Sequence, residues 1–408
     1  MFGRRTVFGF AAGAALIAAT CTGGDDHATP TSEDAPNGAG DAPSATATAS
    51  CTPLPTAAPV DPAQARHLAE ERDGERTQQF LDRDYPQNNY GIAVVGLHEI
   101  FPVLPRDGIQ SIDAPNFDTV EAAGEWLADQ EPVVTFELNG DVCVYPLQIF
   151  TWHEIVNDVG RGEPVIVTYC PLCNTAIAFS RVVDGAVREF EVSGALRRNG
   201  LIMYDRETET WWQQITGEAI VGEGSGTQLD FLVSQIISSA DFRDSFPDGQ
   251  VLNRDTGRRA SYGENPYPLY DALGSRTIFP LDEFEDMQLD AKERVLAVNL
   301  GEDPIAFTFS ALSESIVLTR ESAEQPVVAF WQPDAVSALD ESFIIAGRNI
   351  GAAGAFISAI DGAPATFEVR DGVIVDTGTG NEWNVPDRAI SGPLVGTQLD
   401  PVVSANHF

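Results

Sequence analysis

Residues 169–174 read Tyr-Cys-Pro-Leu-Cys-Asn and end a β-branched run that begins at Val165. A second apolar run, Thr175 to Val183, follows at once, then the pair Asp184-Gly185 and a third run from Val187 to Val192. Short runs of this kind, bounded by turn-forming residues, are typical of strands. The region therefore predicts a strand, a tight loop, a strand, a hairpin turn and a further strand.

The two cysteines of this stretch, Cys170 and Cys173, are the only thiols that the sequence brings together. In thioredoxin-type proteins such a pair opens a long helix, whereas here it falls in a loop between predicted strands. Two thiolates on one loop point the same way, as in metal-binding knuckles. The pair is therefore the main candidate for chemistry in this chain.

An internal repeat extends from this region to the end of the chain. Three groups of residues recur in the same order: Ala178-Phe179, Asp184-Gly185-Ala186 and Phe190-Glu191-Val192 as Ala355-Phe356, Asp361-Gly362-Ala363 and Phe367-Glu368-Val369; Ala219-Ile220 through Gly226-Thr227-Gln228-Leu229-Asp230 as Ala389-Ile390 through Gly396-Thr397-Gln398-Leu399-Asp400; and Pro164 to Tyr169 as Pro326 to Trp331. We expect a β-rich α+β fold of two degenerate tandem repeats, each a mainly antiparallel strand unit with short helices. The first unit spans residues 64–270 and the second 271–408.

The second unit lacks the chemistry of the first. Gln332 stands where Cys170 would be, and Ser313 to Ile316 occupies the region of His153. The unit also stops at His407-Phe408, so it is either naturally short or truncated. Residues present in both units are expected to form the scaffold, and the cysteine pair is expected to carry function.

His153 is the best candidate for a third metal ligand, in the segment Trp152-His153-Glu154-Ile155-Val156-Asn157-Asp158, where Thr151 to Asp158 predicts a short helix. The segment begins like a zincin helix, but Asn157 stands where the second zinc histidine would be. Met203 would complete a soft ligand set suited to copper, and two cysteines with one histidine would suit zinc. Alternatively, His153 is a structural histidine and Met203 a core residue.

Two further interpretations of the pair involve no metal. Outside the cytoplasm adjacent thiols tend to become a disulfide. Cys170 and Cys173 would then be a redox pair in a thiol–disulfide oxidoreductase, or a clip in a non-catalytic binding or structural module. Of the other cysteines, Cys51 and Cys143 could pair with each other.

The N-terminus predicts export. Arg4-Arg5 precede an apolar run from Val7 to Ala19, which is too short to span a bilayer but suits residues 1–21 as a signal peptide of twin-arginine-like or general type. The sequence before Cys21 resembles a lipobox, which predicts lipidation of this cysteine and a membrane-anchored, extracytoplasmic protein; ordinary cleavage nearby is the alternative. Residues 22–63 are rich in small and polar residues and predict a disordered tether.

The net charge is −37, and Lys292 is the only lysine among 24 basic residues. So acidic a chain will not bind nucleic acid through its phosphates, and electrostatic binding to anionic lipid is equally disfavoured. A dense carboxylate surface is typical of adaptation to high salt. The alternative is an acidic site for a cationic partner, and no protein partner is identified.

Longer motifs carry a resemblance to a known family. They are Tyr145-Pro146-Leu147 with Trp152 to Asp158; Val167-Thr168-Tyr169-Cys170-Pro171-Leu172-Cys173; Met203-Tyr204-Asp205-Arg206-Glu207-Thr208; and Asn253-Arg254-Asp255-Thr256-Gly257 with Tyr262-Gly263. The run from Val134 to Tyr267 resembles the domain of unknown function 3179 family, with Asn174 in the place of a typical glycine. The resemblance implies export and a shared Cys/His site, and the family has no settled activity.

Overall fold

The computed structural model describes residues 74–138, 141–160, 162–278, 288–299 and 303–408. The predicted signal peptide, the tether, Cys21 and Cys51 lie outside these residues. Strand makes up 41% and helix 13% of the structure, and nearly all strand pairs are antiparallel. The predicted β-rich character is confirmed.

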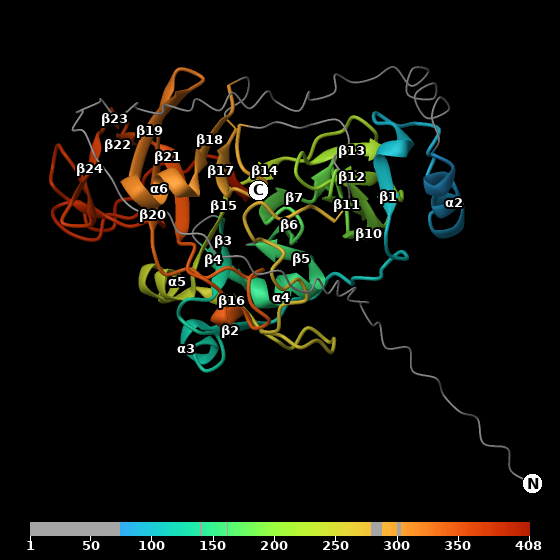
Figure 1. Cartoon of the computed structure of the whole chain (residues 1–408), viewed down its shortest axis with the longest axis horizontal. Helices are drawn as coiled ribbons and strands as arrows, with labels where there is room; N and C mark the ends of the chain where they lie inside the picture. Colours follow the sequence, from blue (N-terminus) through green and yellow to red (C-terminus); the bar gives the residue numbers. More distant parts are fainter. Residues whose placement is uncertain (1–73, 139–140, 161, 279–287, 300–302) are drawn as a thin grey trace, which may run out of the picture. The chain divides into compact units, whose positions relative to one another are not determined.

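The helices are short and the strands numerous (Figure 1). The helices are α2 (Glu75–Asp84), η1 (Leu97–Glu99), α3 (Val120–Ala123), α4 (Leu147–His153), α5 (Ser239–Ser245), α6 (Phe309–Ser315) and η2 (Ile344–Ala346). The strands up to residue 252 are β1 (Ile100–Pro102), β2 (Phe117–Thr119), β3 (Pro132–Leu138), β4 (Asp141–Pro146), β5 (Ile155–Gly160), β6 (Glu163–Cys170), β7 (Thr175–Ser180), β8 (Val182–Val183), β9 (Ala186–Val187), β10 (Phe190–Arg197), β11 (Gly200–Asp205), β12 (Trp211–Gln213), β13 (Glu218–Val221), β14 (Phe231–Leu232), β15 (Ser234–Ser238) and β16 (Gln250–Leu252). The later strands are β17 (Val295–Val298), β18 (Ile305–Thr308), β19 (Val317–Ser322), β20 (Gln325–Gln332), β21 (Ala352–Ile357), β22 (Ala359–Ile360), β23 (Ala363–Pro364), β24 (Phe367–Arg370), β25 (Val373–Asp376), β26 (Glu382–Trp383) and β27 (Ser404–His407).

The cysteine loop connects two central strands of an antiparallel sheet ordered β14-β7-β6-β5. Cys170, the last residue of β6, is paired with Thr175, the first residue of β7. A hairpin turn at Asp184 and Gly185, both with positive φ, then leads through β9 to β10. The predicted order of strand, tight loop, strand, turn and strand is confirmed.

The first half of the chain also contains two five-stranded sheets. One is ordered β1-β10-β11-β12-β13 and the other β15-β3-β4-β16-β2, in which β16 and β4 are the parallel pair. The elements from β17 onward form smaller antiparallel sheets, β18-β17-β27, β19-β20-β21 and β24-β25-β26. No helix in the described part of the chain is both long and apolar enough to cross a membrane.

The helix predicted for residues 151–158 was misplaced. Helix α4 ends at His153, and Ile155–Gly160 forms β5, paired with β6 from Ile155–Thr168 to Gly160–Glu163. Glu154 separates the two elements with a left-handed φ of 59°. The β-branched residues after Glu154 pack better in a sheet than in a helix, so tertiary pairing overrides the local pattern.

Candidate functional site

The sulfur atoms of Cys170 and Cys173 lie 2.9 Å apart, with Cys170 donating to Cys173 and Cys173 to the carbonyl of Asn199 at 3.5 Å. The loop is a tight turn, because the Cys173 amide donates to the Cys170 carbonyl at 3.2 Å. Asn174 closes the turn with a φ of 51°, a conformation that asparagine tolerates better than most residues. The turn therefore aims both sulfurs the same way, as the sequence predicts.

Both sulfurs are enclosed. The residues are 1% and 5% exposed and belong to an apolar cluster that includes Ile155, Leu201 and Met203. Burial raises the pKa of the Cys170 thiol well above its usual range, and the contact with Cys173 raises it further. Cys170 is therefore a protonated thiol at neutral pH, unlike the exposed low-pKa thiolates of typical reactive cysteines.

A buried carboxyl group lies at the same end of β6. Glu154 is 6% exposed, and its carbonyl accepts from the Tyr169 amide at 2.7 Å. The phenol of Tyr267 donates to its Oε1 at 3.4 Å. Burial raises the pKa of Glu154 to about 8, and the negative charge of its ionised form raises the pKa of Cys170. The site thus holds a proton-carrying carboxyl that titrates close to neutrality.

Tyr270, which is distant from the cysteine loop in the sequence, contacts this loop in the folded protein, and Lys292 packs on Tyr270. The phenol of Tyr270 donates to the Leu172 carbonyl at 3.3 Å. The Lys292 ammonium lies 3.4 Å from the centre of the Tyr270 ring and donates to the Tyr270 carbonyl. Burial lowers the pKa of Lys292. The one lysine of the chain therefore stabilises the segment that covers the thiols.

The C-terminal residues close another side of the loop. In β27, Nδ1 of His407 lies 2.9 Å from Oγ1 of Thr175, and the Phe408 amide donates to the Cys173 carbonyl at 3.2 Å. Burial lowers the pKa of His407 to about 4, so its ring is neutral. His407 and Phe408 are thus part of the site.

His153 does not join the sulfurs. Its Nδ1 lies 2.7 Å from the carbonyl oxygen of Gln110, and its Nε2 lies 2.7 Å from the phenol oxygen of Tyr262. Both ring nitrogens are therefore occupied, and burial lowers the pKa of the ring. Among the described residues, no group of three or more His, Cys, Asp or Glu side chains is arranged to hold a metal ion.

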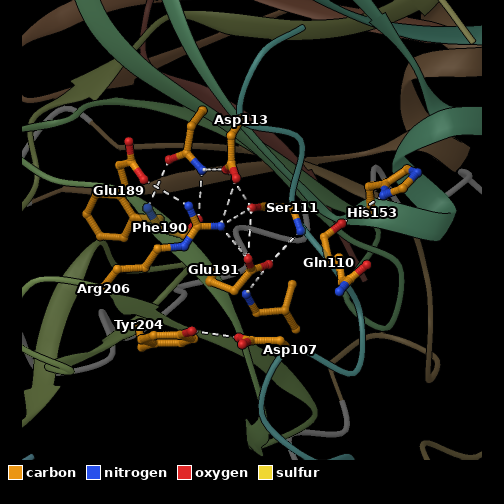
Figure 2. A network of polar contacts seen from close by, with 12 residues as sticks. Asp107, Gln110, Ser111, Asp113, His153, Glu189, Phe190, Glu191, Tyr204 and Arg206 are labelled. Atoms are coloured by element: carbon orange, nitrogen blue, oxygen red, sulfur yellow. Dashed lines mark hydrogen bonds and ion pairs between the residues drawn. The ribbon is translucent and has the colours of Figure 1, made fainter. Parts of the chain in front are cut away.

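A network around Arg206 fixes the segment that carries Gln110 (Figure 2). The guanidinium of Arg206 contacts carboxylate oxygens of Glu191 at 2.5 Å, Glu189 at 2.9 Å and Asp113 at 3.0 Å. Glu191 also accepts from the Ser111 amide at 2.5 Å. The network pins residues 110–113 against β10 and β11, and so places the partner of His153.

Of the other predicted site residues, Met203 shares the cluster of the two thiols. It is fully buried in β11, paired with Val192 and Trp212. Cys143 is half-buried in β4. Its predicted disulfide partner, Cys51, and the predicted lipidation site, Cys21, lie outside the described residues.

Sequence reasoning missed Glu154, Tyr267, Tyr270 and His407 as site residues. Glu154 stands directly after the selected His153, and a polar residue at the boundary between predicted elements was the available signal. No local pattern marks Tyr267, Tyr270 or His407, because each reaches the site only through the tertiary fold.

The fold and the site together define a β-rich protein with a buried dithiol and a neighbouring carboxyl group. The chain belongs to the family described as "Protein of unknown function (DUF3179)", whose model matches residues 106–408. No curated protein matches the chain, and no solved structure matches it. The resemblance seen in the sequence is thereby confirmed, and it extends to the last residue.

Proposed function

We propose that Cys170 and Cys173 form a thiol–disulfide redox site. The observation that carries the proposal is the 2.9 Å separation of the two sulfurs. A disulfide needs about 2.05 Å, so a shift of less than about 1 Å would form the bond. In the step, a partner disulfide takes two electrons from the pair and leaves as two thiols, carrying the two cysteine protons, while the Cys170–Cys173 bond forms.

Glu154 supports this chemistry because its ionised form, which is populated as the pH rises toward its pKa of about 8, can accept the proton of Cys170. The attacking species in disulfide exchange is a thiolate, which burial disfavours at this site. A carboxyl with a pKa of about 8 is a suitable base near neutral pH. The sulfurs are almost fully enclosed. The partner is therefore a small disulfide, or Tyr270 moves to admit a larger one.

A purely structural clip is less well supported. Closing a loop of only four residues restricts the unfolded chain little, so a clip would add only about 2 kcal/mol. The site also holds Glu154, Asn174 and Asn199 at positive φ. Asparagine tolerates this conformation, so Glu154 is the strained residue of the three, and strained residues gather at functional sites.

A copper or zinc site for metal handling or electron transfer is the second candidate. Met203 lies in the same buried cluster as both sulfurs, and two thiolates with a thioether form a soft set that suits copper. His153 would not be a ligand without leaving Gln110 and Tyr262. The metal would also have to displace the Cys170 proton, against the raised pKa of that thiol.

We also propose that residues 64–270 and 271–408 are degenerate tandem repeats. Parallel structural details support this. Ile316 follows α6 with a φ of 64° and accepts from the Trp331 amide, as Glu154 follows α4 and accepts from Tyr169. The order β17-β18-α6-β19-β20-β21 also matches β3-β4-α4-β5-β6-β7.

Export and lipid anchoring through Cys21 belong to the same proposal, supported by the sequence of residues 1–21. An extracytoplasmic location would supply the oxidising surroundings that a disulfide needs.

The test is the covalent state of the pair in protein purified without reductant. The Cys143→Ser protein is unfolded in the presence of iodoacetamide and digested, and the peptide masses are measured by mass spectrometry. Cys170→Ser and Cys173→Ser, each made in the Cys143→Ser protein, are the controls. A peptide lighter by two hydrogens that reappears as a dialkylated species after mild reduction supports the redox site. Stoichiometric copper or zinc that is lost in both controls would support the second candidate instead.

A further inference from the structure

A second site lies away from the thiols. A cavity of about 470 Å³ opens between β3, β4, β14, β15 and the loops around residues 386 and 400. Neither cysteine lines it, nor do Glu154, Tyr267 or His407. Its volume falls in the range of small-molecule sites, roughly 300–1,000 Å³. Nothing in the proposed thiol chemistry uses this cavity.

Carboxylate groups converge on the cavity. Glu137, Asp387 and Asp400 all line it. The Gln398 amide donates to Glu137 and to Asp387, each at a long 3.4 Å. No lysine or arginine is among the described residues that line the cavity, and the guanidinium of Arg388 lies 3.8 Å from Glu137. At pH 8, above the raised pKa of about 7 of Asp387, three carboxylates against one guanidinium leave the cavity with excess negative charge.

Asp387 occupies a backbone position that favours glycine. Its φ is 81°, and its carbonyl accepts from the Leu399 amide. In the first half of the chain Gly217 does the same for Leu229, with a φ of 64°. Glycine adopts this conformation freely, so the fold alone does not require a carboxylate here.

Apolar residues make up most of the remaining wall, beside the polar Thr135, Ser234 and Gln235. Phe231 and Phe246 contribute aromatic rings, and Val142, Leu399 and Pro401 contribute aliphatic surface. The guanidinium of Arg388 also lies over the ring of Phe246, 4.6 Å from the ring centre. An occupant must therefore present an apolar body to the rings and a positive charge to the carboxylates.

We propose that this cavity binds a small organic cation, an amine or guanidine with an apolar body. Its charged group would lie between Glu137 and Asp387, where the present donor, Gln398, is neutral and distant. Its apolar part would pack on Phe231 and Phe246. The cavity offers both halves of this recognition, and a bare metal ion would leave the apolar half unused.

The test is isothermal titration of the protein at pH 8 and fixed ionic strength with 2-phenylethylammonium. Methylammonium and 2-phenylethanol serve as probes that keep only the charge or only the apolar body. We expect one saturable site for 2-phenylethylammonium, and binding at least tenfold weaker for each of the other two probes. Asp387→Asn is expected to weaken binding of 2-phenylethylammonium at least tenfold, and asparagine tolerates the positive φ.

Asp361→Asn is the matched control, since Asp361 has a φ of 49° in a hairpin turn that does not line the cavity. Glu137→Gln gives an independent test, because the side chain of Glu137 is 38% exposed and its loss should not affect folding. The proposal is overturned by equal affinity for 2-phenylethanol, by no saturable binding, or by unchanged binding in both Asp387→Asn and Glu137→Gln.

Discussion

The indole nitrogen of Trp212 donates to Oδ2 of Asp205 at 2.9 Å, across the turn between β11 and β12. Asp205 also accepts from the amide and the hydroxyl of Thr208, each at 2.7 Å. In the second half, Asp376 accepts from the amide and the hydroxyl of Thr379, each at 2.6 Å, and from the indole of Trp383 at 3.2 Å. The same three donors therefore converge on one aspartate at the same spacing in both halves.

Asp205→Ala and Asp376→Ala should therefore destabilise the protein by similar amounts. Each leaves buried donors unsatisfied, and we expect about 2–4 kcal/mol of lost unfolding free energy from each. Urea unfolding monitored by tryptophan fluorescence measures both. A large loss for one variant and none for the other would contradict the proposed equivalence of the two halves.

Glu154→Gln should change the pH dependence of disulfide formation. If Glu154 accepts the Cys170 proton, the wild-type rate rises as the carboxyl ionises around its pKa of about 8. The variant should lose this inflection and be slower at pH 8 by roughly a hundredfold. Stopped-flow oxidation by a small disulfide between pH 6 and pH 10 measures it, with Glu163→Gln as an exposed control on β6. An unchanged profile would remove Glu154 from the mechanism.

His407 should make the protein sensitive to acid. Its pKa is about 4 in the folded protein and 6.5 in the unfolded chain, so only the unfolded chain gains this proton as the pH falls from 6.5 to 4. The neutral ring therefore makes its full contribution to the unfolding free energy above pH 6.5. Between pH 6.5 and 4 the unfolding free energy falls by on the order of 2 kcal/mol. His407→Gln should show a shallower loss in urea unfolding at pH 4–7. Parallel slopes for the two proteins would contradict a neutral, partly buried ring in the folded protein.

Asp387 should destabilise the folded protein at high pH, whereas His407 destabilises it at low pH. Burial raises its pKa to about 7, so the folded state holds a proton that the unfolded chain releases near 3.8. Unfolding free energy is therefore lost as pH rises from about 4 to 7. Asp387→Asn should be more stable than the wild type at pH 8 by on the order of 2 kcal/mol, with the difference vanishing near pH 3. Equal stabilities at pH 8 would contradict the raised pKa.

The local order around the cysteines could be predicted because it rests on short-range signals. Turn residues at 184–185, β-branched runs and the Cys-Pro-Leu-Cys spacing each act within a few residues. The boundary at Glu154 could not, since a left-handed residue between a helix and a strand is fixed by the pairing of β5 with β6. His407 and Tyr270 reach the loop from more than 90 residues away in sequence, and no local pattern records such contacts.

For the candidate metal ligands too, the sequence predicts what depends on neighbouring residues and does not predict what depends on the tertiary fold. The sequence predicts correctly that Cys170 and Cys173 face each other, because only two residues separate them on one turn. It also selected His153 by residue type alone, whereas the ring contacts Gln110 and Tyr262. Residue type suggests which chemistry a side chain can perform, and only the fold decides which side chains meet.

The most direct test of the redox site is a titration of the folded Cys143→Ser protein in glutathione buffers of graded potential. After each equilibration the thiols are trapped and counted by mass spectrometry. We predict a single reversible two-electron transition in which Cys170 and Cys173 change together, absent from Cys170→Ser and Cys173→Ser. A pair that stays reduced at every potential, or that becomes reducible only after the protein unfolds, would contradict the proposal.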